Sequence, residues 1–177
     1  MRRYVLFLLL FVGSGWLFYT WYNELIIISW AHKKTVAVPL AHHRERRKIV
    51  LHYHAKNRWL KDEQDLIVSD DKSFSLTTII TVWLHLLMQE HILRKPVLLQ
   101  QVLLDIHEQE AYLSFDMSLF DENQSVYEKM MIVEGLLKTI REYYPKLQSV
   151  MLLVNNQPLK DHHLLFSRSW PIMGFTS

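Results

Sequence analysis

Two amphipathic helices give the clearest hydrophobic pattern in the chain. Apolar residues recur at three- and four-residue steps over residues 75–92, which places them on one stripe of a helix. A second stripe follows Ser125 and Glu128, whose spacing is that of a capping box, and Pro145 ends it. We therefore expect one helix over about residues 75–92 and another between Ser125 and Pro145.

Alternating apolar and polar residues predict the strands, because successive side chains of a strand point to opposite faces. Polar residues 108–110 separate two alternating runs and predict a hairpin, and Asn155-Asn156 predicts a tight turn after the last strand. A polar stretch over residues 56–64 separates the first strand from a short second one. The predicted strands cover about residues 48–55, 65–69, 102–106, 111–115 and 150–154.

The order of these elements is β-β-α-β-β-α-β, which predicts an α+β fold with a small mixed sheet and two helices. One transmembrane helix is expected to precede it. Residues 4–22 carry no charge, and at about 1.5 Å per residue such a run approaches the roughly 30 Å of a hydrocarbon core. We therefore expect a transmembrane anchor over residues 1–30, a basic tether over residues 31–47 and one folded domain over residues 48–177.

Charge leaves the orientation of this anchor open. Arg2 and Arg3 favour a cytoplasmic N-terminus, whereas residues 33–34 and 44–48 place more positive charge on the other side. The basic tether is either solvated or rests on anionic lipid or on a cell-wall polymer.

Composition excludes several classes of function. Residues 49–177 hold 12 Lys and Arg against 16 Asp and Glu, so the domain is acidic and lacks the positive surface that attracts nucleic acids. The chain has no cysteine, which excludes disulfides, thiolate metal sites and a cysteine nucleophile. Gly135 and Gly174 are the only glycines after the anchor, too few for a phosphate-binding loop. We expect no nucleic-acid partner and no cofactor.

Four histidines are the only candidate metal ligands with suggestive spacing. His52 and His54 lie two residues apart and share one face of a strand, and His162-His163 could add imidazoles. Their spacing is not that of a His-Glu-x-x-His helix or another known metal motif. We therefore expect no metal site.

Asp116, Ser118 and Asp121 lie together after a strand, where an enzyme could hold a nucleophile. No Gly-x-Ser-x-Gly elbow surrounds Ser118, so we expect these side chains to bind nearby backbone groups and we assign no catalytic residue. The alternative is a membrane-tethered hydrolase whose site has no recognisable motif.

Several stretches, taken in their order and spacing, resemble the GerM domain, also called the sporulation and spore germination domain. The resemblance covers about residues 48–171. Its strongest segment is residues 111–120, where a strand ends in Asp116 and Ser118 as in the Asp-x-Ser sequence of the family, and Glu134 in the second helix is another family-like position. The chain departs from the family at Asn156, where members have glycine, and in holding one copy of the domain.

This resemblance implies a single-pass protein of the cell membrane whose domain lies outside the cytoplasm and has no catalytic activity. Its expected partner is another envelope protein, a cell-wall polymer or a second copy of the chain. Because two helices cover only one face of a small sheet, the other face is the expected interface, with Tyr112, His52 and His54 on it. A cytoplasmic-facing assembly factor of a membrane complex is the alternative that the basic residues 44–48 favour.

Overall fold

The computed structural model describes residues 44–175. The predicted transmembrane anchor and most of the predicted tether lie outside these residues. Within residues 44–175, neither helix combines the length and the apolar character needed to cross a bilayer.

The described residues form two helices and seven strands. They follow the predicted order β-β-α-β-β-α-β, with two short strands added at the end. The elements are β1 (Arg44–Ala55), β2 (Arg58–Ser69), α2 (Lys72–Gln89), β3 (Leu99–Leu104), β4 (Glu110–Phe115), α3 (Val126–Tyr143), β5 (Ser149–Val154), β6 (Gln157–Pro158) and β7 (Trp170–Pro171).

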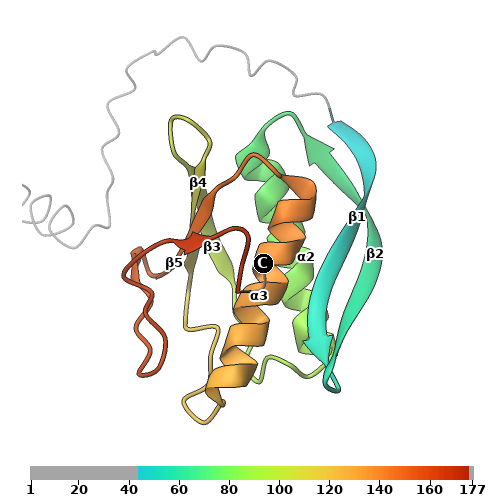
Figure 1. Ribbon diagram of the computed structural model, residues 1–177. Helices are drawn as coiled ribbons and strands as arrows, with labels where there is room; N and C mark the ends of the chain where they lie inside the picture. Colours follow the sequence, from blue (N-terminus) through green and yellow to red (C-terminus); the bar gives the residue numbers. More distant parts are fainter. Residues whose placement is uncertain (1–43, 176–177) are drawn as a thin grey trace, which may run out of the picture. The chain divides into compact units, whose positions relative to one another are not determined.

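The prediction of one small mixed sheet was wrong, because the strands form two sheets. β1 and β2 make an antiparallel hairpin by themselves, and the other strands form a five-stranded sheet in the order β3-β4-β5-β6 with β7 beside β5. β3 and β4 are antiparallel and β4 and β5 parallel, so this second sheet is mixed. Figure 1 shows α2 and α3 between the hairpin and the sheet. Both helices therefore bury residues toward two layers.

The second strand is much longer than predicted. β2 pairs with β1 along its whole length, from Arg58 opposite Ala55 to Ser69 opposite Arg44. Its polar residues alternate between exposed and half-buried positions because β2 is a free edge with one solvated face. A search for an apolar run detects only the end of such a strand. β1 also begins at Arg44, so the last four residues of the predicted tether belong to this strand.

The helices cover the edge of β1 that β2 leaves free. The His52 N–H donates to Oγ1 of Thr139 on α3 at 2.9 Å, and Nε1 of Trp83 on α2 donates to the His52 carbonyl at 2.8 Å. Gly135 lets α3 approach closely, since a Cβ at this position would lie 3.0 Å from the His52 carbonyl oxygen. Side-chain groups of both helices thus satisfy β1 backbone groups that no strand pairs.

Local signals predicted from sequence reappear in the structure. Ser125 and Glu128 form the predicted capping box of α3. The cap of α2 was not predicted correctly: Asp71, and not Ser73 or Ser75, caps this helix by accepting from the Phe74 N–H at 3.2 Å. Asn155 and Asn156 have φ of 49° and 62°, so they form the left-handed turn expected after β5.

Candidate functional site

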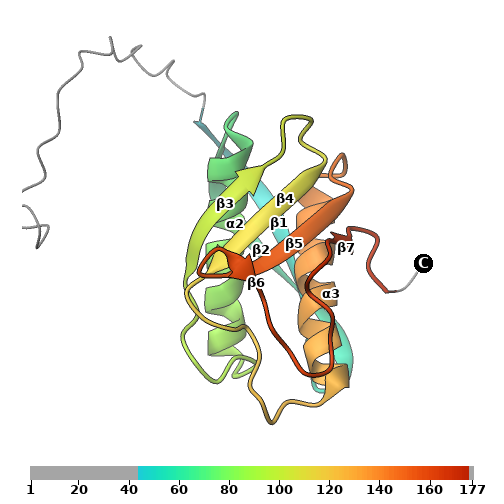
Figure 2. The same ribbon diagram turned by 90° about the vertical axis from the view of Figure 1, so that its left-hand side faces the viewer.

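The outer face of the five-stranded sheet is the first candidate surface. On β4, Ala111, Leu113 and Phe115 are fully buried toward the helices, so Tyr112 points to the opposite face. The strand register aligns Tyr112 with Leu103 on β3 and with Met151 on β5. Figure 2 shows that, among residues 44–175, no helix covers this face. We call Leu103, Tyr112 and Met151 the outer row.

The Tyr112 side chain is held in place on this face. Its hydroxyl donates to Oε2 of Glu110 at 2.8 Å, and the same carboxylate accepts from the Ser169 hydroxyl. The hydrogen bond to the Glu110 carboxylate, followed by burial, raises the pKa of Tyr112 above its ordinary value. Tyr112 is therefore neutral at physiological pH and presents a fixed, half-buried ring.

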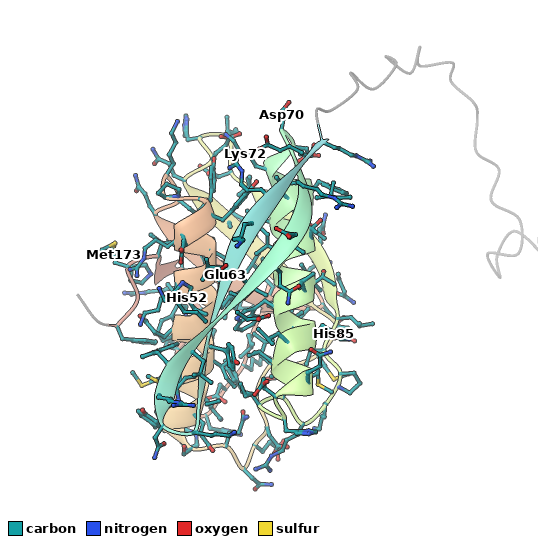
Figure 3. The ribbon with its side chains drawn as sticks, turned by 90° about the vertical axis from the view of Figure 1, so that its right-hand side faces the viewer. His52, Glu63, Asp70, Lys72, His85 and Met173 are labelled. Atoms are coloured by element: carbon teal, nitrogen blue, oxygen red, sulfur yellow. The ribbon has the colours of Figure 1, made fainter. Side chains whose placement is uncertain are left out.

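The other two predicted interface residues lie on the hairpin, in a different layer from Tyr112. The His52 side chain is 12% exposed, and its imidazole contacts the Glu142 carboxylate of α3. His54 packs edge-on against the rings of Trp59 and Tyr127. Figure 3 shows the hairpin crossing in front of the helices, with His52 on the side of α3. The structure therefore does not bring the three residues to one surface.

The family-like positions make structural contacts. Oδ1 of Asp116 accepts from the Leu98 N–H at 2.8 Å, which ties the start of β3 to the end of β4. Oγ of Ser118 accepts from the Phe120 N–H at 3.1 Å. Ser118 thus bonds to local backbone, as the sequence indicated, whereas the backbone partner of Asp116 lies 18 residues away in the chain.

Glu134 lies on a buried stretch of α3 and holds the C-terminal segment. It is 1% exposed, and its carboxylate accepts from the Phe175 N–H at 2.8 Å and lies 3.5 Å from Nζ of Lys138. Gly174, with φ of 76°, passes so close that a Cβ there would overlap the Glu134 carboxylate. The contact fixes the path of the chain after β7.

A groove of about 700 Å³ is a second candidate surface, which no pattern in the sequence indicated. It lies where the β1–β2 turn, the end of α2 and the start of α3 meet. Buried Tyr53 and Trp83 contribute to its lining, and Tyr127, which is 55% exposed, lies along it. Lys56, Glu90, His91, Arg94 and Glu128 also line it, so both charge signs are present. No single segment contains enough of these residues to form a pattern.

A buried ion pair joins α3 to the loop between β6 and β7. Lys129 is 1% exposed and its Nζ lies 2.5 Å from Oδ2 of Asp161. Oδ1 of Asp161 accepts from the N–H groups of His163 and Leu164. Burial by itself would raise the pKa of Asp161. The hydrogen bonds from the Lys129 ammonium group and from the two backbone N–H groups outweigh burial and hold the pKa below its ordinary value.

No metal centre is formed by the part of the chain that the structure describes. Within residues 44–175, no three His, Asp or Glu side chains are grouped so as to hold an ion. His163 lies beside Asp161, with Nδ1 4.0 Å from Oδ1, and His52 contacts only one carboxylate.

Comparison with known proteins gives matches among solved structures alone. No family model and no curated protein matches the chain. A candidate lipoprotein from Clostridium perfringens has 15% identity and a TM-score of 0.39, with 72% of this chain and 87% of that chain covered. The tandem GerMN domains of the sporulation protein GerM from Bacillus subtilis have 12% identity and a TM-score of 0.47. That match covers 75% of this chain and 46% of the tandem chain, so this chain spans less than half of its length. The second structure thus comes from the family that the sequence resembles.

Proposed function

We propose that this chain is a membrane-anchored, non-catalytic envelope domain of the GerM type that binds another protein through the outer face of its five-stranded sheet. The observation that carries the proposal is the outer row. Leu103 is 51% exposed and Tyr112 is half-buried, and both lie on a face that neither of the two described helices covers. A solvated sheet face ordinarily carries polar residues, whereas the core of a protein interface is enriched in aromatic and methionine side chains.

The surroundings of the outer row also suit an interface. Gln101 and Glu110 lie next to it in the register of β3 and β4, so polar groups border an apolar centre. The hydrogen bond to Glu110 already fixes the Tyr112 ring, so binding costs less side-chain entropy than it would for a freely rotating ring.

The location of the domain is tested by reporter fusions at the C-terminus. The uncharged residues 4–22 are the proposed anchor, and the resemblance to GerM domains supports a domain outside the cytoplasm. A reporter that is active only outside the cytoplasm is expected to work when fused after Ser177, and one that is active only inside is expected to be silent. Activity of the inside reporter alone would reverse the orientation and favour a cytoplasmic assembly factor.

Replacing Tyr112 with glutamate is expected to abolish partner binding while the domain stays folded. A charge at the centre of an interface is left without a partner, and such hot-spot changes weaken binding by about 2 kcal/mol or more. The measurement is co-purification from native membranes, compared between the wild-type chain and the Tyr112→Glu variant, with circular dichroism as the check on folding.

Tyr127→Glu is the matched control, since Tyr127 is also partly exposed but lies on α3 beside the groove. It is expected to retain every partner that Tyr112→Glu loses. If Tyr127→Glu loses the partner and Tyr112→Glu keeps it, the binding surface is the groove and the proposal for the sheet face is wrong.

A further inference from the structure

β3 differs from the other long edge strand of the domain in its charge. β2 carries five charged residues among its twelve, Arg58, Lys61, Asp62, Glu63 and Asp65. β3 has the sequence Leu-Gln-Gln-Val-Leu-Leu and no charge. Charged residues are a common protection of free strand edges against pairing with another chain. β2 is protected in this way and β3 is not.

Backbone groups of β3 are directed at its free edge. The Asp105 N–H donates to the Glu110 carbonyl at 3.0 Å. Because hydrogen-bonding directions alternate along an antiparallel pair, the N–H and C=O groups of Leu104 and Val102 point away from β4. Within residues 44–175 no strand pairs with this edge. A bulge between Leu99 and Gln101 ends the regular part, which leaves residues 101–104 able to pair.

We propose that β3 pairs antiparallel with β3 of a second copy of this chain, about a twofold axis at Leu103. The two five-stranded sheets then form one continuous sheet. This inference goes beyond the proposed function, which concerns the face of the sheet and not its edge. Tyr112 lies one strand further in and stays free, and the two outer rows meet end to end at Leu103 across the joined sheet.

The charge that follows β3 favours this orientation of the second copy. Asp105 comes directly after the strand. Hydrogen bonds from the backbone N–H of Glu110 and its neighbours lower the pKa of Asp105, so this group is anionic at physiological pH. With the axis at Leu103, antiparallel pairing sets Asp105 opposite Gln101 of the second copy and so keeps the two Asp105 carboxylates apart, whereas parallel pairing would place these like charges together.

Apolar side chains along the edge also gain from pairing. Leu98 is 65% exposed, Leu103 51% and Ile106 97%. At the proposed axis Leu103 packs against its own copy, in the closely spaced type of antiparallel pair. A contact of one short strand buries less than the roughly 1,600 Å² of a standard interface, so it is weak in solution. The proposed membrane anchor would raise the local concentration and favour it.

Disulfide trapping of the full chain in membranes tests the pairing directly, because the chain has no cysteine of its own. With Leu103→Cys, mild oxidation by copper phenanthroline is expected to give a covalent dimer. Ile67→Cys is the matched control, since Ile67 is 49% exposed on the edge strand β2. The control is expected to stay monomeric. No dimer with Leu103→Cys, or equal dimer from both variants, would overturn the proposal.

Charge variants test the same axis without a cross-link. Leu103→Lys places two like charges at the axis and is expected to weaken self-association of the purified chain about tenfold, as is Leu103→Glu. An equimolar mixture of the two variants is expected to recover it. If either variant alone associates like the wild-type chain, the edge is not the interface. A chain that carries both Tyr112→Glu and Leu103→Cys separates this proposal from the proposed function. It is expected to lose the envelope partner and still to form the covalent dimer.

Discussion

Replacing Lys129 with methionine is expected to destabilise the domain by about 3–5 kcal/mol, because it leaves the Asp161 carboxylate buried without its cation. Lys129 is 1% exposed and the Asp161 side chain 8% exposed, so water cannot replace the lost ammonium group. Two backbone N–H groups still bind Asp161, but they carry no net charge. Urea unfolding followed by tryptophan fluorescence measures the change.

Adding Asp161→Asn to the Lys129 variant is the control. The amide oxygen can still accept from the His163 and Leu164 N–H groups, and the double variant buries no charge. It is expected to recover most of the lost stability. A single Lys129→Met variant that loses less than about 1 kcal/mol would show that the carboxylate reaches water, contrary to the structure.

The lowered pKa of Asp161 predicts that acid destabilises the domain. The folded state lowers the pKa of Asp161, so the stabilisation is complete above its unfolded value of about 3.9 and is lost as pH falls through the lower folded value. The urea midpoint of the wild-type chain is therefore expected to fall more steeply below about pH 4 than that of Asp161→Asn. Parallel curves would assign the acid sensitivity to other carboxylates.

Trp83→Ala is expected to cost about 3–5 kcal/mol, the usual range for removing a fully buried aromatic side chain. Trp83 has no exposed surface, and its Nε1 donates to the His52 carbonyl on the free edge of β1. The substitution therefore leaves a cavity and also removes the hydrogen-bond donor of a buried carbonyl. The hairpin and α2 both depend on this one side chain.

Trp83→Phe separates these two effects, because it keeps most of the ring volume and loses the N–H. It is expected to cost about 1–3 kcal/mol, the penalty of an unsatisfied buried acceptor. The free energy of unfolding and hydrogen exchange of β1 measure the two variants. If Trp83→Phe unfolds as readily as Trp83→Ala, the hydrogen bond dominates; if Trp83→Phe matches the wild-type chain, the His52 carbonyl has another donor.

The sandwich of helices between two sheets determines which surfaces can bind a partner. α2 and α3 cover the inner sides of both the hairpin and the larger sheet. Within the described part of the chain, no helix covers the outer face of the larger sheet and no strand pairs with its β3 edge. The two proposals therefore concern adjacent parts of one layer, and the stability variants change residues in the layers beneath it.

The sequence by itself determined the local features of this protein. Both helices follow from the spacing of their apolar residues, and the start of α3 follows from Ser125 and Glu128, because these signals act within a few residues of the backbone groups they satisfy. The turn at Asn155 and Asn156 follows from their tolerance of left-handed φ. The direction of Tyr112 follows from the alternation of β4 with Ala111 and Leu113.

Only the tertiary structure decided how these elements share their surfaces. β2 contains no long apolar run, so its length could not be predicted from the pattern. Pairing with β1 along the whole strand decides it. Lys129 and Asp161 are 32 residues apart, and His52 finds Trp83 and Thr139 on two different helices. Periodicity reports which face of an element is buried but not which layer buries it. His52 and Tyr112 therefore look alike along the chain but lie in different sheets, because long-range packing assigns each strand to its layer.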